Sequence, residues 1–192
     1  MILGITGGTG CGKTTLLSCI RDRGGLVLDC DEVYYRLLKE DRGLLEAIGT
    51  RFPGTVEKGS LNRKKLGSLV FADAAALVEL NAITHKAVRA EVVRVLEEEK
   101  PSFAAIDAIA LFEGNLARLC DKTVAVTAPL EDRVKRLMLR DNISEEYARS
   151  RIDAQHDESW FRERVDFVLE NQGTAQEFRK KCGEFLDTLG IL

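Results

Sequence analysis

Long apolar runs are missing from the sequence. Hydrophobic residues make up 45% of the 192, yet no stretch approaches the roughly 18 consecutive apolar residues of a membrane helix. The chain starts Met1-Ile2-Leu3-Gly4 and leads at once into a glycine-rich segment, without the basic region and cleavage site that precede export. We therefore expect a soluble protein that has no membrane contact and stays in the cytoplasm.

The cysteines lack the spacing of a disulfide framework or a zinc site. There are five, an odd number, and they are scattered without a Cys-x-x-Cys pair (Cys11, Cys19, Cys30, Cys120 and Cys182). We expect reduced thiols.

An excess of basic residues is also missing. The net charge is −3 and the isoelectric point is near 5.6, whereas a nucleic-acid-binding domain normally shows a basic bias. We expect no nucleic-acid partner, and any anionic ligand must be held by local positive groups.

Short apolar runs alternate with helical patterns along the chain. The runs predict buried strands at residues 2–6, 26–28, 103–106, 123–126 and 167–169. Helices are predicted at 13–23, 32–39, 44–52, 63–71, in a short piece from Asp73, at 85–99 entered through Thr84, at 130–140, at 145–154 and from the capping box at Thr174 to about Leu189. No strand is expected within 32–99, and the strands at 103–106 and 123–126 are expected to precede helices.

This alternation predicts an α/β fold, in which a five-stranded parallel sheet is flanked by helices. We expect residues 1–192 to form one domain, with 32–99 and 130–164 as subdomains of it. Ligands of such sheets bind beyond the carboxyl ends of the strands.

The strongest motif is the phosphate loop Gly7-Gly8-Thr9-Gly10-Cys11-Gly12-Lys13-Thr14, between the first strand and the first helix. Its glycines let backbone N–H groups surround an anion at a helix N-terminus. Lys13 is expected to reach the β- and γ-phosphates of ATP, and the Thr14 hydroxyl to bind Mg²⁺. The ATP-binding prediction covers Gly8, Thr9, Gly10, Cys11, Gly12, Lys13, Thr14 and Thr15.

Two large classes of phosphate-loop and kinase proteins are excluded by motifs that the sequence lacks. It has no Asn-Lys-x-Asp motif for reading guanine, and neither the His-Arg-Asp nor the Asp-Phe-Gly motif of protein kinases. The size of the chain suits a small phosphotransferase.

Asp29 and Asp31 follow the second strand and have two interpretations. A carboxylate there could orient or deprotonate an acceptor hydroxyl, or hold a water bound to Mg²⁺. Alternatively, one of the two caps the next helix, and Asp31 is placed to do so.

Arg133, Arg136 and Arg140 lie three and four residues apart on one predicted helix. Their guanidinium groups could close over a transferring phosphate and spread its charge. The alternative is a solvated basic face.

The sequence as a whole resembles the dephospho-coenzyme A kinase family. The resemblance lies in Gly4-Ile-Thr-Gly-Gly-Thr-Gly-Cys-Gly-Lys-Thr-Thr15, Asp29-Cys-Asp31, Ser60-Leu-Asn-Arg-Lys-Lys-Leu66 with Val70-Phe71, Leu80-Asn-Ala-Ile-Thr-His85, Leu111-Phe-Glu113, Gln155, and Asp166-Phe-Val-Leu-Glu-Asn-Gln-Gly173. It implies a phosphate-loop kinase fold and transfer of the γ-phosphate of ATP to the ribose 3′-hydroxyl of dephospho-CoA, with Mg²⁺.

The resemblance also implies residue roles. Asp31 would be the base or orienting group, and Lys13 and Arg140 would stabilise phosphate charge. Residues 32–99 would bind the acceptor and about 140–164 would form a lid. Residues implied near the adenine of ATP are Asn171 and Gly173, and those implied at the acceptor are Thr6, Asp31, Leu61, Arg63, His85, Leu111 and Glu113.

Some positions depart from the family pattern. Cys11 stands where serine is usual and could be oxidised near phosphate, Ile109 and Lys86 stand where proline is usual, and Arg133 stands where glutamine is usual. Two other functions stay open at this point: a nucleoside or nucleoside-monophosphate kinase, and a nucleotide-binding module without activity.

Overall fold

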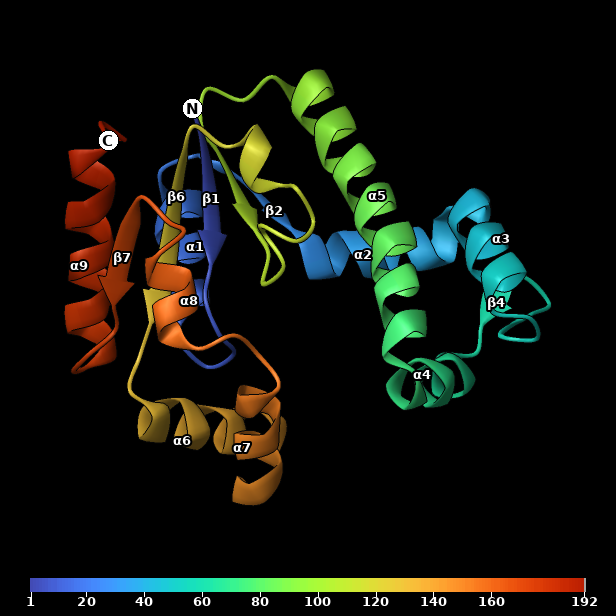
Figure 1. The fold of residues 1–192 in the computed structure, drawn as a ribbon. Coiled ribbons are helices and arrows are strands. Elements are labelled where there is room, and N and C mark those ends of the chain that lie inside the picture. Colours follow the sequence, from blue (N-terminus) through green and yellow to red (C-terminus); the bar gives the residue numbers. More distant parts are fainter. Residues whose placement is uncertain (192) are drawn as a thin grey trace. The chain divides into compact units, whose positions relative to one another are not determined.

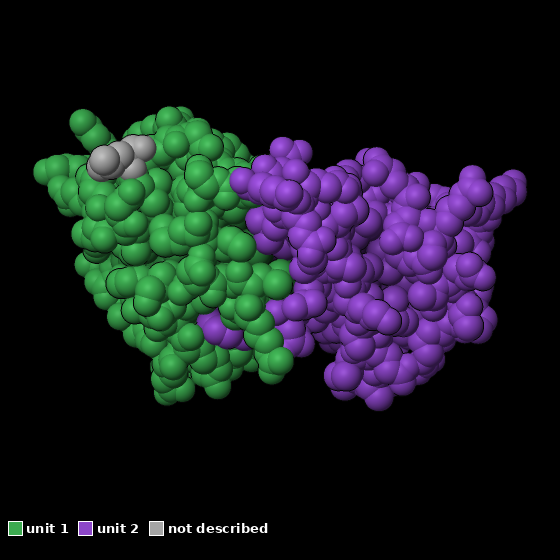
Figure 2. Space-filling model, turned by 90° about the horizontal axis from the view of Figure 1, so that it is seen from above, with its two compact units in different colours: residues 1–28, 101–111, 116–192 green, residues 29–100, 112–115 purple. Residues whose placement is uncertain are grey.

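The computed structural model describes residues 1–191, and the chain divides into two compact units, which Figure 2 colours separately. Unit 1 comprises residues 1–28, 101–111 and those from 116 onward, and unit 2 comprises residues 29–100 and 112–115. Unit 2 thus takes in the whole of the predicted helical insertion.

A five-stranded sheet with the order β2-β5-β1-β6-β7 runs through unit 1, as predicted (Figure 1). The pairs that β1 forms with β5 and β6, and β6 with β7, are parallel. The strands are β1 (Ile2–Thr6), β2 (Leu26–Asp29), β5 (Ala104–Asp107), β6 (Lys122–Thr127) and β7 (Phe167–Glu170). Strands β2 and β5 lie on one side of β1, and the later strands β6 and β7 lie on the other. The carboxyl end of β1 is therefore a topological switch point, where sheets of this kind bind ligands.

Helices α1 (Lys13–Asp22) and α9 (Ala175–Thr188) contact each other and pack on the sheet. The capping box predicted for α9 is present. Helices α6 (Leu130–Asp141) and α7 (Glu145–Asp153) share a second apolar cluster, and the short α8 (Glu158–Arg162), which was not predicted, lies against β6.

One predicted connection was wrong. The strand predicted at residues 103–106, which the structure has as β5, was expected to precede a helix, but turns and the 3₁₀ helix η1 (Ala117–Leu119) follow it. The apolar side chains in this segment meet the sheet instead: a Cβ on Gly4 would lie 3.0 Å from the Leu111 side chain.

Unit 2 is built from α2 (Cys30–Glu40), α3 (Arg42–Arg51), α4 (Arg63–Ala72) and α5 (Ala74–Glu99). A small antiparallel hairpin, β3 (Val56–Glu57) and β4 (Ser60–Leu61), corrects the prediction that no strand occurs here. Its two-residue turn, Lys58-Gly59, has positive φ at both positions, which suits the twist of a tight hairpin.

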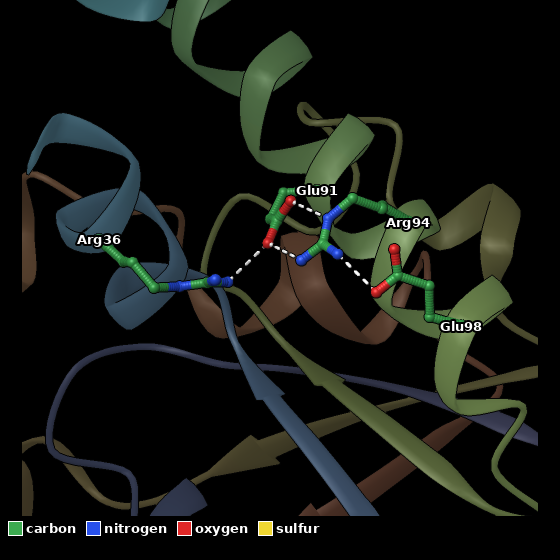
Figure 3. Close-up of polar contacts among 4 residues, drawn as sticks. All are labelled: Arg36, Glu91, Arg94 and Glu98. Atoms are coloured by element: carbon green, nitrogen blue, oxygen red, sulfur yellow. Dashed lines mark hydrogen bonds and ion pairs between the residues drawn. The ribbon is translucent and has the colours of Figure 1, made fainter. Parts of the chain in front are cut away.

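A third correction concerns α5, which is one continuous helix of 26 residues. Thr84, expected to cap a separate helix, is buried within α5, and its hydroxyl donates to the carbonyl of Leu80 at 3.0 Å. Across unit 2, Glu91 of α5 accepts hydrogen bonds from Arg36 of α2 and from Arg94, which also pairs with Glu98 (Figure 3). These bonds link α2 to α5.

None of the helices within residues 1–191 is both long and apolar enough to span a bilayer. Within the same range the cysteines form no disulfide.

Candidate active site

The phosphate loop connects β1 to α1 at the switch point, and its glycines are required by geometry. Gly7 has φ of 129°, and a Cβ on it would lie 2.2 Å from the backbone oxygen of Val126. Gly12, the residue before α1, has φ of 101°. Residues other than glycine rarely adopt such backbone conformations, so the loop depends on glycine at both positions.

Three side chains from two distant segments, helix α6 and the turn after β7, bind successive carbonyl groups of the loop. Arg133 Nε donates to Thr9 O at 2.9 Å, Arg136 Nη1 donates to Gly10 O at 3.2 Å, and Asn171 Nδ2 donates to Cys11 O at 2.8 Å. With its carbonyl oxygens held by these donors, the loop keeps backbone N–H groups for an anion.

The same contacts exclude a solvated basic face for two of the three arginines. Arg133 and Arg136 bind carbonyl groups of the phosphate loop, and closure over a transferring phosphate stays a prediction. Arg140 is exposed and makes a two-pronged bond with Asp141, which also binds Arg151. These bonds hold the pKa of Asp141 below its usual value and raise the pKa of Arg140.

Lys13 and the two threonines after it begin α1. The Lys13 ammonium donates to Gly7 O at 3.1 Å, so it folds back over the loop. Thr14 is exposed and Thr15 is half-buried. In phosphate-loop proteins, an ammonium group and a hydroxyl at the N-terminus of this helix are the groups that bind nucleotide phosphates and a metal ion.

Gln155 contacts the loop as well. Its Oε1 accepts from the Thr9 N–H at 2.8 Å, although it lies 146 residues away. A Cβ on Gly8 would lie 2.3 Å from Arg133 Nη2 and 3.3 Å from Gln155 Oε1, so both side chains cover Gly8. Burial lowers the pKa of the Arg133 guanidinium.

Cys11, a residue of the loop, is almost completely buried. Burial raises the pKa of its thiol, outweighing the opposing effect of Lys13. Because the thiolate is the reactive form, this burial opposes the oxidation that the sequence suggested.

The residues of unit 1 fit a magnesium ion. Mg²⁺ usually takes one or two protein oxygen ligands and completes its shell with phosphate and water, so a dense ligand cluster is not needed, and residues 1–191 contain no such cluster of His, Cys, Asp and Glu. Thr14 offers an exposed hydroxyl, and Asp107 ends β5 beside Ile5 of β1, where its charge acts on Cys11.

In unit 2, the structure resolves which aspartate caps α2. Asp29 Oδ1 accepts from the N–H groups of Asp31 and Glu32 at 2.9 and 3.1 Å. Asp29 is therefore the cap, and Asp31 lies exposed in the first turn of the helix. Arg63, the first residue of α4, stacks over the Tyr35 ring at 4.4 Å, one turn after Asp31 on α2.

The other predicted acceptor residues are distributed over both units. Leu61 ends β4, Glu113 is exposed in a turn, and His85 lies in the middle of α5, not at a helix start. Thr6 and Leu111, in unit 1, are fully buried, and Thr6 Oγ1 donates to Ile109 O.

Of the two residues expected near adenine, Asn171 is buried and its amide holds the phosphate loop. Gly173 has φ of 90° in the turn before α9. Gln155 was known only as a residue of the family pattern, because nothing local in the sequence indicates a contact with Thr9.

Comparison with known proteins identifies the family of the chain. A family model described as dephospho-CoA kinase matches residues 1–177. The chain is 32% identical over 189 residues to the dephospho-CoA kinase of Latilactobacillus sakei, covering 96% of this chain and 94% of that one.

Two solved structures have the same fold. The Thermus thermophilus protein TT1252 superposes with a TM-score of 0.82 at 34% identity, covering 98% of this chain and 97% of that one. The dephospho-CoA kinase from Campylobacter jejuni has a TM-score of 0.67 at 27% identity, with 98% and 96% covered. The chain therefore belongs to the dephospho-CoA kinase family, whose members are phosphate-loop kinases.

Proposed function

We propose that this protein transfers the γ-phosphoryl group of ATP to the ribose 3′-hydroxyl of dephospho-CoA, which gives coenzyme A in the last step of its biosynthesis. The observation that carries the proposal is a complete phosphate loop, with Lys13 folded over it, in a chain that matches the family along residues 1–177. Its substrates are then small molecules, and its place of action is the cytoplasm.

On the donor side, Lys13 and the N–H groups of Gly8 to Thr15 would bind the phosphates of ATP. Thr14 and Asp107 would hold Mg²⁺, which neutralises phosphate charge when bound. Asn171 would act indirectly, because its amide fixes the loop at Cys11. Arg140 would exchange its bond with Asp141 for one with phosphate.

On the acceptor side, we assign residues 32–99 to dephospho-CoA and Asp31 to its 3′-hydroxyl. Asp29 caps α2, and Asp31 lies exposed in the first turn of that helix. The Asp31 carboxylate would orient the hydroxyl or accept its proton. Arg63, held over Tyr35, supplies a positive charge for the anionic acceptor. The other residues that we assign to the acceptor are Leu61, His85, Leu111, Glu113 and Thr6.

Residues of about 140–164 would form the lid. Gln155, within this range, already contacts the loop through Thr9. A lid that closes over both substrates would exclude water and suppress wasteful hydrolysis of ATP.

The test is release of ADP by the purified protein with MgATP, with and without dephospho-CoA, together with the mass of the product. We expect a gain of one phosphate on dephospho-CoA at the ribose 3′ position. ADP release that ignores dephospho-CoA but responds to a nucleoside or nucleoside monophosphate would overturn the acceptor. Binding of ATP without turnover of any acceptor would indicate an inactive nucleotide-binding module.

A further inference from the structure

Arg133 combines an anchored position with a donor that the protein does not use. Its Nε is fixed by the bond to Thr9 O, and the guanidinium lies against Gly8 in the first half of the phosphate loop. Its Nη2 is buried and, among the described residues, meets no hydrogen-bond acceptor. Buried donors of folded proteins nearly always have a partner, so this one calls for an acceptor.

The surroundings of Nη2 favour an anionic acceptor. Lys13 and Arg136 also bind the loop, so three positive side chains meet at a backbone shaped for an anion. The neighbouring Gln155 Oε1 is already engaged with the Thr9 N–H. Glu158 and Asp153 are the carboxylates whose charge acts on Arg133, but neither bonds Nη2.

We propose that Arg133 is a phosphate-binding residue, whose Nη2 donates to a phosphate oxygen of the nucleotide held in the loop. This inference rests on the proposed function, because it needs ATP in the phosphate loop, and it adds a ligand that neither the loop motif nor Arg140 supplies. The Nε bond to Thr9 positions the guanidinium in advance, so little side-chain freedom is lost when the nucleotide binds.

Three substitutions separate phosphate binding from a purely structural role. In Arg133→Gln, the amide nitrogen occupies the place of Nε and can keep the bond to Thr9 O, while the charged end of the side chain is lost. Arg133→Lys keeps a charge near the position of Nη2. Arg133→Met loses both. The control is Arg179→Gln, which removes an arginine paired with Asp22 on the outer helices α9 and α1.

The measurement is the dissociation constant of MgATP by calorimetry, using the full chain without acceptor, with thermal unfolding to confirm that each variant folds. We expect Arg133→Gln and Arg133→Met to weaken binding about tenfold to a hundredfold, the usual range for a charged hydrogen bond. Arg133→Lys should weaken it by less than tenfold, and the control should bind as the unsubstituted chain does.

Unchanged binding by Arg133→Gln would overturn the inference. If Arg133→Met is weakened in that case, the bond to Thr9 accounts for the role of Arg133, and if it is not, Arg133 has no role in binding MgATP. If Arg133→Met does not fold, the comparison of MgATP binding by Arg133→Gln and Arg133→Lys decides whether Arg133 binds phosphate. These outcomes differ from failure of the proposed function: a chain that binds MgATP but does not phosphorylate dephospho-CoA loses its assigned acceptor, and a chain that does not bind MgATP loses both claims.

Discussion

The contact between Gly12 and Asn171 allows a quantitative test of how the phosphate loop is held. A Cβ on Gly12 would lie 2.3 Å from Asn171 Nδ2, the atom that donates to Cys11 O. Gly12→Ala should therefore carry two costs. The left-handed backbone costs about 1–3 kcal/mol for a residue with a side chain, and displacement of the Asn171 amide costs about 1–2 kcal/mol more, since a buried carbonyl loses its main donor.

The second cost disappears when Asn171 is already alanine. We expect Gly12→Ala to lower the free energy of unfolding by about 2–5 kcal/mol in the natural chain but by only about 1–3 kcal/mol in the Asn171→Ala background. The coupling energy is then about 1–2 kcal/mol, well above the roughly 0.3–0.5 kcal/mol expected of independent sites. Urea unfolding of the four proteins in the cycle measures it.

Gly24 supplies the control. It also has positive φ, 75°, but a Cβ on it would meet nothing within 4 Å. Gly24→Ala should therefore show the backbone cost alone, and the same cost with or without Asn171. If Gly12→Ala also costs the same in both backgrounds, the Asn171 amide does not constrain Gly12, and its bond to Cys11 O is not what holds this part of the loop.

Three further predictions concern activity, reactivity and pH. Asp31→Asn should lower kcat by about 10²–10⁴-fold while calorimetry shows unchanged MgATP binding; an unchanged kcat would contradict its role. Cys11 of the folded chain should react with iodoacetamide far more slowly than Cys11 of the chain unfolded in urea, as followed by mass spectrometry. Equal rates in the two states would contradict the burial of Cys11. Bonds from Thr123 lower the pKa of Asp166, so its stabilisation is complete above about pH 3.9, the unfolded value, and is lost as pH falls through the lower folded value. Because the Asp166 side chain is 44% exposed, Asp166→Ala should lower the free energy of unfolding in urea by only about 1 kcal/mol at neutral pH. At about pH 3 the loss should be smaller, and an equal loss at both pH values would refute this prediction.

The parallel sheet could be predicted because its strands are short apolar runs that end in glycine or polar residues. The phosphate loop could be predicted because its spacing is set by the anion it surrounds. The break expected at Thr84 failed because a threonine hydroxyl can bond to a carbonyl of its own helix, here Leu80, instead of capping a new one. The i, i+4 series of buried residues through α5 was the better signal.

The side chains that hold the loop from outside were less accessible to prediction. Arg133 and Asn171 bind carbonyl groups more than a hundred residues away. No local pattern distinguishes such an arginine from one on a solvated face, because the partner is a backbone oxygen that any residue carries. The hairpin at Lys58-Gly59 did have a local signal, since glycine in a two-residue loop favours positive φ.

The place of β1 in the sheet also has a consequence for synthesis on the ribosome. The phosphate loop is among the first segments to be made, yet both strands that pair with β1 come from about a hundred residues later. At about 5–20 residues per second, β1 would wait roughly 5–20 s for them. Unit 2 makes its helical contacts mostly within residues 29–100, so it could fold during that interval, while the nascent nucleotide site still lacks the strands that shape it.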